Sequence, residues 1–391
     1  MSRAPWIEQA FGLDKLARVH HTLGKYFILP LVAHPVLITA AYATYAGLPF
    51  FKQYLSMLQY EDMLGAVVGF WLFLGIIIYS ILQVWKRWNF ERWYYVHLAL
   101  YLAVAVSFGH QLELGGDFTN SPVATIYWFA LYASVALTIG VFRFALPLWK
   151  NYKHQFQVTS VSEETSDVYS VEIGGKSLDA FHFTAGQFLF VRFLAKPFFR
   201  ESHPFSISKS YDGRTVRQTI KGIGDFTKTI SQIPVGTKVY VEGPYGIFTA
   251  KRAQGTKILA LAGGIGITPF VGLLEDLGKA GKDIELIYGN KTESDIALRK
   301  ELEVLAVKYK FKIHHVLSNA EVLPDPNTYN LQPTTYSSGF ITPELITQLV
   351  PDAATREVFL CGPPVMMNGL LKSLPTIGID KNKIYFEKFS L

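Results

Sequence analysis

The sequence predicts a multidomain membrane protein: an α-helical transmembrane bundle, an antiparallel β-barrel, and an α/β domain with a doubly wound sheet. Charged residues make up only 17% of the 391 residues, and the first 150 residues are the poorest in charge. Soluble domains have about 25%. From about residue 155 the pattern becomes that of a soluble protein, first with short strands and then with alternating strands and helices. We expect domains at 1–152, 153–250 and 251–391.

The first domain contains four apolar segments, each near the ~20 residues that cross a bilayer as a helix. They lie at about 23–46, 63–85, 93–112 and 123–149. Basic residues gather in the connection at 85–93, whereas Glu113 and Asp117 lie in a connection without basic residues. The positive-inside rule therefore places the N-terminus and both later domains on the cytoplasmic side. We expect an integral protein of a lipid bilayer, most simply a bacterial inner membrane.

Composition excludes several classes of function. The net charge is +6, but lysine and arginine are scattered, so no basic run suited to nucleic acid is present. Cys361 is the only cysteine, which excludes a disulfide framework and a thiolate metal site.

Two of the predicted spans carry histidines at matched depths. His20 and His34 in the first span, and His97 and His110 in the third, are each separated by about 20 Å along a helix. Each could be a hydrogen-bonded core histidine, but an intramembrane ionisable residue is a candidate functional residue by default. Two helices that each offer one imidazole at two depths would supply axial ligands to two haem irons.

Helix geometry favours some of these ligands more than others. A spacing of fourteen keeps His20 within about 40° of His34, whereas His21 is turned about 140° away. His97 and His110 have the same 140° offset, so the third span needs a distortion before both can face the first span.

The second domain contains three ordered motifs that suit a flavin. HPFSIS at 203–208 places a polar residue and Ser206 on a strand, IKGIGDFT follows at 220–227, and EGPYG at 242–246 is either part of the site or an ordinary turn. Glycine lets backbone amides approach a pyrophosphate closely. The residues expected to bind flavin are His203, Pro204, Phe205, Ser206, Ile207, Ser208, Gly222, Gly224, Asp225, Phe226 and Thr227.

The third domain contains two loops that suit a dinucleotide. LAGGIGITP at 261–269 follows an apolar strand and opens a helix, although it is not the standard G-x-G-x-x-G. LCGPP at 360–364 follows a later parallel strand. The residues expected to bind the nucleotide are Gly263, Gly264, Gly266, Thr268, Pro269, Gly362 and Pro363.

Four further residues have two interpretations each. Cys361 either contacts the nicotinamide or is a small buried hydrophobe. Phe389, near the C-terminus, either stacks on the flavin or packs in a core. Lys291 and Arg299 either meet the 2′-phosphate of NADPH, which favours NADPH over NADH, or are solvated residues on a helix face.

Together these motifs resemble the ferric reductase and NADPH oxidase superfamily, over nearly the whole chain. The resemblance implies two b-type haems held by the paired histidines, FAD that takes hydride from NADPH or NADH, and direct roles for Cys361 and Phe389. Family members typically have six spans, and this chain matches from just before the third. A partner subunit, a second copy of this chain or a shortened form of a longer chain would each account for the flank that this difference leaves uncovered.

The expected activity is transmembrane electron transfer from cytosolic NAD(P)H, through FAD and two haems, to an acceptor on the outer face. The acceptor is dioxygen, as in a superoxide-forming NADPH oxidase, or ferric iron held in a chelate, as in a ferric reductase. Two alternatives stay open: an electron-donating subunit for a periplasmic protein, and a haem-free flavin reductase anchored in the membrane.

Overall fold

The computed structural model describes residues 4–60, 63–86, 90–116, 121–320, 322–324 and 334–388. Contacts within the chain divide it into two compact units. The membrane unit consists of Lys15–Arg143. The reductase unit consists of Arg3–Asp14 together with Phe144–Leu391.

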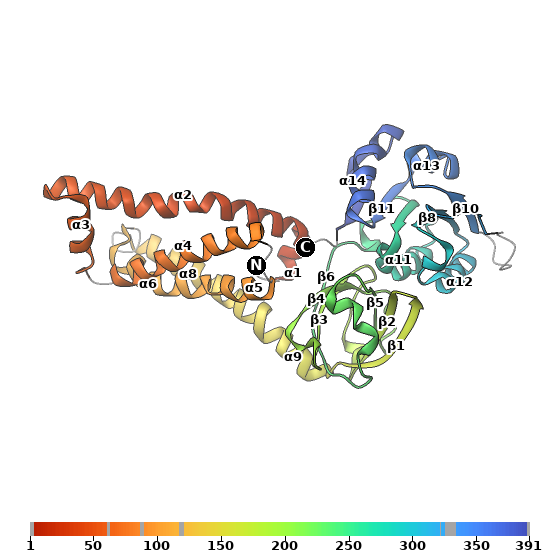
Figure 1. Cartoon of the computed structure of the whole chain (residues 1–391), viewed down its shortest axis with the longest axis horizontal. Coiled ribbons are helices and arrows are strands. Elements are labelled where there is room, and N and C mark those ends of the chain that lie inside the picture. Colours follow the sequence, from red (N-terminus) through yellow and green to blue (C-terminus); the bar gives the residue numbers. More distant parts are fainter. Residues whose placement is uncertain are drawn as a thin grey trace. The chain divides into compact units, whose positions relative to one another are not determined.

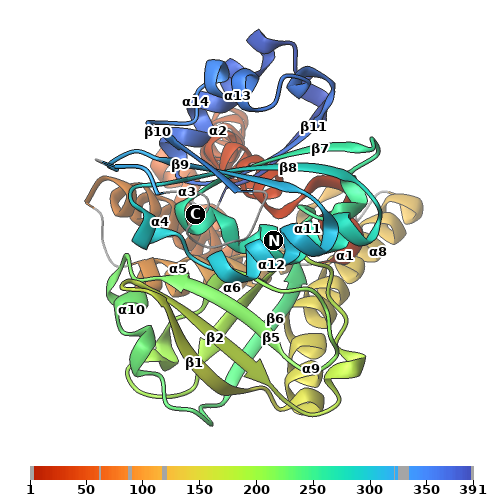
Figure 2. The ribbon, with the colours of Figure 1, turned by 90° about the vertical axis from the view of Figure 1, so that its right-hand side faces the viewer.

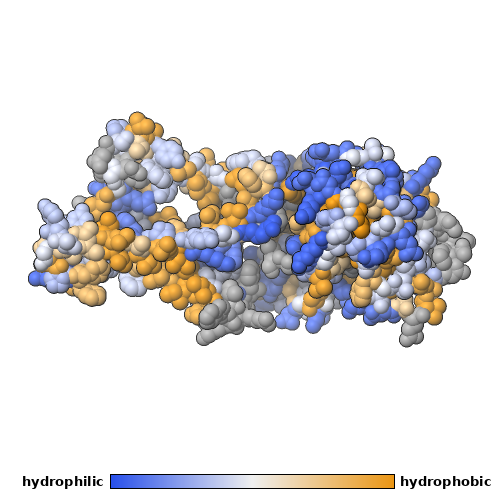
Figure 3. All heavy atoms as spheres, turned by 90° about the horizontal axis from the view of Figure 1, so that it is seen from above, coloured by the Kyte–Doolittle hydropathy of each residue, from blue (hydrophilic) through white to orange (hydrophobic). Residues whose placement is uncertain are grey.

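The membrane unit is entirely helical, as Figure 1 shows. Its elements are α2 (Leu13–Ala46), α3 (Phe50–Met57), α4 (Met63–Lys86), α5 (Phe90–Leu98), α6 (Leu100–Leu114) and α8 (Pro122–Ile139), followed by a π-helical turn at Gly140–Ala145. Four described stretches are long and apolar enough to cross a membrane: Lys15–Ala46, Met63–Gln83, Arg92–Leu114 and Pro122–His154. They confirm the four predicted spans. Large apolar side chains cover much of this unit in Figure 3, as lipid-facing helices require.

Two glycines bring α4 and α6 into close contact. A Cβ atom at Gly65 would lie 2.6 Å from the Val106 carbonyl oxygen, and one at Gly69 would lie 3.0 Å from the Ala103 carbonyl oxygen. Small residues four positions apart allow membrane helices to approach closely, because apolar burial gives little driving force inside a bilayer.

The flavin domain of the reductase unit consists of two three-stranded antiparallel sheets, with strand orders β1-β2-β5 and β4-β3-β6. The strands are β1 (Gln157–Thr165), β2 (Val168–Gly174), β3 (Phe188–Phe193), β4 (His203–Ser206), β5 (Val216–Lys221) and β6 (Val239–Tyr245). Single bridges, Gln157 to Lys238 and Ile207 to Gln218, join the sheet edges. Among the described residues the predicted barrel is therefore two bridged sheets rather than a continuous closed one.

The third domain confirms the predicted α/β class. Its six-stranded sheet has the order β10-β9-β8-β7-β11-β12, and every pair is parallel. The strands are β7 (Lys257–Gly263), β8 (Asp283–Asn290), β9 (Lys312–Leu317), β10 (Thr334–Ser338), β11 (Glu357–Cys361) and β12 (Ile384–Glu387). The chain order reverses between β7 and β11, the place where doubly wound sheets bind ligands.

Helices cover both faces of this sheet, as Figure 2 shows. α11 (Thr268–Lys279) and α12 (Arg299–Tyr309) pack on one face, and α13 (Pro343–Leu349) and α14 (Pro364–Ser373) pack on the other. Because both faces are buried, the strands are apolar runs rather than alternating ones.

A buried arginine joins three elements at the amino-terminal ends of the central strands, opposite the switch-point crevice. Arg356 is 4% exposed. Its guanidinium donates to the Ile258 carbonyl at 3.3 Å, and it pairs with the carboxylates of Asp283 at 3.1 Å and Asp352 at 2.8 Å.

Replacing this arginine is expected to destabilise the reductase unit. Arg356→Met removes the donors from one buried carbonyl and two carboxylates, a loss of roughly 2–3 kcal/mol. For a unit of this size the thermal midpoint should fall by roughly 5 °C or more, measured by release of bound flavin in detergent. Lys257→Met is the matched control: it removes an exposed ion pair to the same Asp352 and should change the midpoint little. Equal shifts would contradict the assigned role of burial.

Candidate functional site

The third span is broken between its two histidines. α5 ends at Leu98 and α6 begins at Leu100, and the Ala99 amide bonds to Val96 O three residues back at 3.0 Å. This tightened turn changes the rotation of the chain about the helix axis. It is the distortion that the thirteen-residue spacing requires.

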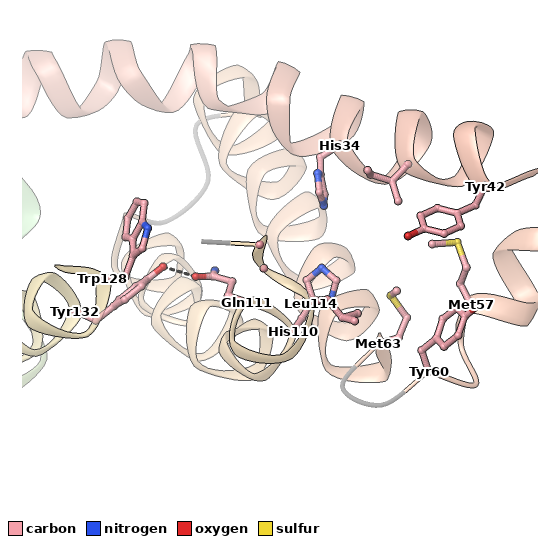
Figure 4. A pocket seen from close by; sticks show the side chains of 13 residues that line it. His34, Tyr42, Met57, Tyr60, Met63, His110, Gln111, Leu114, Trp128 and Tyr132 are labelled. Atoms are coloured by element: carbon pink, nitrogen blue, oxygen red, sulfur yellow. Dashed lines mark hydrogen bonds between the residues drawn. The ribbon is translucent and has the colours of Figure 1, made fainter. Parts of the chain in front are cut away.

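Each histidine of the first span faces one from the third span. The ring centroids of His20 and His97 are 6.0 Å apart, and those of His34 and His110 are 6.4 Å apart. A metal–imidazole bond of about 2 Å would place two opposed rings on one iron with centroids about 6.3 Å apart. Figure 4 shows His34 and His110 pointing toward each other from α2 and α6. Both pairs therefore fit a haem with two axial imidazoles.

The surroundings of the pairs agree with this fit. The Nδ1 atom of His97 is buried and, among the described residues, accepts or donates no hydrogen bond. Such an orphaned polar atom calls for a partner. Trp93 packs on the His97 ring with centroids 5.0 Å apart. In the described part of the chain no group of three or more histidine, cysteine or acidic side chains could hold a bare metal ion. A haem needs only two from the protein.

A cavity of about 750 Å³ surrounds the His34–His110 pair. Figure 4 shows Trp128 and Tyr132 on one side of the pair and Tyr42, Met57, Tyr60 and Met63 on the other. The Tyr132 hydroxyl donates to Gln111 Oε1 at 2.5 Å. Apart from the two histidines, the described residues that line the cavity include no ionisable group other than tyrosine phenols. The described part of the lining is thus aromatic, rich in thioethers and without charged side chains.

The HPFSIS motif lies on β4 and at its end. The His203 ring packs on Phe226 with centroids 4.2 Å apart, and its Nε2 atom is 2.8 Å from Glu201 Oε2. These contacts bring the first and second flavin motifs together. Ile207 and Ser208, in contrast, are fully buried, and Ser208 Oγ is hydrogen-bonded to Thr219 Oγ1 at 2.8 Å. Their side chains therefore belong to the core, which leaves only their backbone groups for contact with a flavin.

The glycines of the GDFT motif also differ from the prediction. The Gly222 amide donates to the Asp167 carbonyl at 2.7 Å, and the Gly224 amide donates to Thr227 Oγ1 at 2.9 Å. Both amides therefore already have hydrogen-bond partners within the protein. The bond from Gly224 is part of the cap of the short helix α10 (Asp225–Lys228). Ile223, Gly224 and Asp225, around the start of α10, are exposed, as is Lys228 at its end.

One face of the β4-β3-β6 sheet contains candidate flavin contacts that sequence reasoning missed. Phe190 lies opposite Pro204, and Phe188 lies opposite Ser206, so all four share one face. Arg192 lies two residues beyond Phe190, and its Nε atom is buried without a hydrogen-bond partner among the described residues. The alternation in FLFVRF at 188–193 was the signal that could have found this face.

The two nucleotide motifs lie side by side at the switch point. A Cβ atom on Gly266 would lie 2.5 Å from Cys361 O and 2.7 Å from Gly362 Cα. A Cβ atom on Gly263 would lie 2.9 Å from Pro363 Cδ. The remaining predicted residues follow in the same turn: Gly264 with φ +50°, and Thr268 and Pro269 at the start of α11. The sequence thus brings both glycine-rich loops to one crevice.

Cys361 differs from its predicted catalytic role. Its side chain is fully buried in the apolar core beneath α11, and burial raises the pKa of its thiol well above the usual value. The thiol therefore presents no surface to a nicotinamide. Phe389, the other residue predicted to act directly, lies outside the described residues.

The burial of the Cys361 thiol leads to a specific prediction. Cys361→Ala should leave the rate of flavin reduction by NADPH within about threefold, since it deletes one core atom and no reacting group. The native thiol should also resist alkylation by maleimide until the protein is unfolded. A hundredfold loss of flavin reduction, with normal thermal stability, would restore the catalytic interpretation.

Arg299 and Lys291 have different surroundings. The guanidinium of Arg299 pairs with Glu293 at 2.5 Å and Glu303 at 2.9 Å, and it donates to the Tyr336 hydroxyl at 2.5 Å. These contacts raise the pKa of Arg299 and engage its donors, so the structure does not present this residue to a 2′-phosphate. Lys291, just after β8, is exposed.

Comparison with known families assigns each part of the chain. Residues 1–108 match the model of a ferric reductase like transmembrane component, residues 153–249 match an FAD-binding domain, and residues 260–372 match an oxidoreductase NAD-binding domain. This is the domain set of a membrane flavin-dependent NAD(P)H oxidoreductase of the ferric reductase type.

Individual proteins are similar to the reductase part. NADH-cytochrome b5 reductase 1 of Lodderomyces elongisporus is 34% identical over 166 residues, which are 41% of this chain and 52% of that protein. The chain therefore spans about half the length of the curated relatives it matches. The crystal structure of the Amycolatopsis cytochrome P450 reductase covers 61% of this chain and 70% of its own, with a TM-score of 0.52 and 21% identity. A ferredoxin NADP+ reductase from Neisseria gonorrhoeae has a TM-score of 0.50 and 19% identity, and covers 61% of this chain and 99% of its own. These two likenesses show the fold. With all three domain matches in order along one polypeptide, the chain matches the domain set of the ferric reductase and NADPH oxidase superfamily.

Proposed function

We propose that the protein carries electrons from NAD(P)H across a membrane through FAD and two b-type haems. The observation that carries this proposal is the pair of imidazole separations, 6.0 and 6.4 Å, at two depths of the same helices. FAD supplies the change from two-electron hydride chemistry to single-electron transfer, and haem iron supplies single-electron relay.

The chain's own residues have distinct parts in this scheme. Gly263–Pro269 and Gly362–Pro363 hold the nucleotide at the switch point of the sheet. Pro204, Ser206 and the opposite Phe188 and Phe190, which share one face of the sheet, hold the flavin ring, and His203 packs on Phe226 of the second flavin motif. His20 with His97, and His34 with His110, ligate one iron each. The protein thus binds and orients the cofactors.

Dioxygen is the acceptor that the cavity favours. The described cavity lining around His34 and His110 lacks a cationic side chain that would attract an anionic ferric chelate. A small neutral molecule enters such a cavity without loss of ion hydration. His34 and His110 would both be ligands of a bound haem, which would supply single electrons to dioxygen without binding it.

The membrane orientation and the partners are part of the same proposal. The reductase unit faces the cytoplasm, by the charge of the connections, and a bacterial inner membrane is the proposed location. A partner subunit or a second copy of this chain that packs on the membrane helices is part of the proposal. Lys291 is exposed, whereas Arg299 is engaged by two glutamates, so Lys291 is the proposed partner of a 2′-phosphate and NADPH the proposed donor.

The purified protein in air, supplied with FAD, tests the proposal. NADPH consumption that matches superoxide dismutase-sensitive superoxide would support an NADPH oxidase. Slow turnover in air with fast anaerobic reduction of ferric citrate would identify a ferric reductase instead. Reduced haems without turnover on either acceptor would favour a periplasmic protein acceptor. Absence of a haem Soret band would leave the haem-free reductase, and faster turnover with NADH would overturn the NADPH preference.

A further inference from the structure

Two segments that flank the four spans in sequence are both fastened to one strand of the flavin domain. They are α1 (Pro5–Phe11), before the first span, and α9 (Leu146–His154), after the last. Both belong to the reductase unit, and both bond to β6 or to the residue that follows it.

The fastening of α9 uses a side-chain amide in place of a neighbouring strand. Asn151 Oδ1 accepts from the Val241 amide at 2.8 Å, and Asn151 Nδ2 donates to the Val241 carbonyl at 2.7 Å. Lys150 Nζ donates to the Gly243 carbonyl at 2.8 Å. The Asn151 side chain thus makes the same two hydrogen bonds to Val241 that a residue of a neighbouring antiparallel strand would make, and it holds this edge of β6.

The fastening of α1 depends on one buried carboxyl group. Glu8 is 5% exposed, and its Oε1 atom accepts from the Gly246 amide at 2.6 Å. Burial raises the pKa of Glu8, so the fold holds this group where a carboxylate is unfavourable. Gly246 in turn has φ +104°, and a Cβ there would lie 3.1 Å from the Phe188 ring. Glu8 is therefore bonded to the loop that packs on the candidate flavin face.

We propose that Glu8 is a positioning residue for electron transfer: its bond to Gly246 holds the chain leading into the first span on the flavin domain. The proposal rests on the proposed function, because it concerns the step from flavin to the His20–His97 site. Two electrons enter the flavin domain as one hydride and leave singly to iron. Loss of the bond should slow chiefly the second step, since the glycine loops of the nucleotide crevice belong to other elements.

The experiment compares three variants of the full-length protein in nanodiscs. Glu8→Ala removes the acceptor, Glu8→Gln keeps an acceptor oxygen, and Gln9→Ala is the control because Gln9 is an exposed neighbour on α1. Anaerobic stopped-flow with NADPH follows flavin and haem absorbance separately. In Glu8→Ala we expect haem reduction to slow severalfold, because the chain that leads into the first span loses its buried bond to the flavin domain. Flavin reduction should stay within twofold, and Glu8→Gln should recover most of the haem rate.

Hydrogen exchange at the Gly246 amide provides a readout that does not depend on activity. Exchange should be faster in Glu8→Ala than in Gln9→Ala, and near wild type in Glu8→Gln. Unchanged haem reduction in Glu8→Ala, or an equal fall of both rates, would overturn the positioning role. A wild-type protein without haem would refute the proposed function, and the exchange experiment would then still decide whether Glu8 holds Gly246.

Discussion

His34→Ala should remove one haem per chain and stop electron transfer across the membrane. The variant loses one of two imidazoles whose ring centroids are 6.4 Å apart. A haem held by one imidazole alone, in a cavity whose described lining offers no imidazole besides these two, should be bound weakly. We expect the haem content, measured as the pyridine complex, to fall by about half. Superoxide formation should fall at least a hundredfold, whereas flavin reduction by NADPH should not change.

Two further variants make this result specific. His21→Ala is the matched control, because His21 is a histidine of the same helix that belongs to neither pair. It should keep haem content and turnover. His34→Met should keep the haem but raise its reduction potential, since a thioether favours the reduced iron. Full haem content and normal superoxide formation in His34→Ala would refute the assignment of His34 as a ligand.

How far the sequence predicts this site depends on the kind of information each residue carries. His34 and His110 could be paired from depth alone, because a helix rises by a constant amount per residue. Their facing rotation could not, since it depends on the broken turn at Ala99. No glycine or proline marks that turn, so no local signal predicts it.

The soluble domains show the same division. Alternation of strands and helices predicts the parallel sheet and the meeting of the two glycine loops, because ligand loops gather at the switch point. It does not predict which side chains are already engaged in hydrogen bonds, ion pairs or core packing within the protein. Arg299 is a plausible phosphate partner by position but pairs with two glutamates, one from its own helix and one from the preceding turn. Cys361 likewise belongs to a nucleotide motif, yet its side chain is buried in the core that packs against α11.

Gly266→Ala should disable nucleotide binding while leaving the rest of the chain intact. The new methyl group would lie 2.5 Å from Cys361 O and 2.7 Å from Gly362 Cα, which are backbone atoms that cannot rotate away. Either loop must move, and overpacking of this kind typically costs about 1–3 kcal/mol. Because both loops line the switch-point crevice, a shift of about 1 Å should slow hydride transfer by roughly a hundredfold.

The measurement separates this effect from a general loss of structure. Flavin reduction by NADPH should slow about a hundredfold in Gly266→Ala, but reduction by dithionite, which needs no nucleotide site, should keep its rate. Gly369→Ala in α14 is the control, because a Cβ there has no atom within 4 Å; alanine should be neutral or slightly stabilising in that helix. Normal NADPH kinetics in Gly266→Ala would mean that the two loops do not form the nucleotide site. A parallel loss of the dithionite reaction would mean that the substitution damages the flavin domain instead. The contact with backbone rather than with a flexible side chain is what makes this glycine the most sensitive position of the crevice.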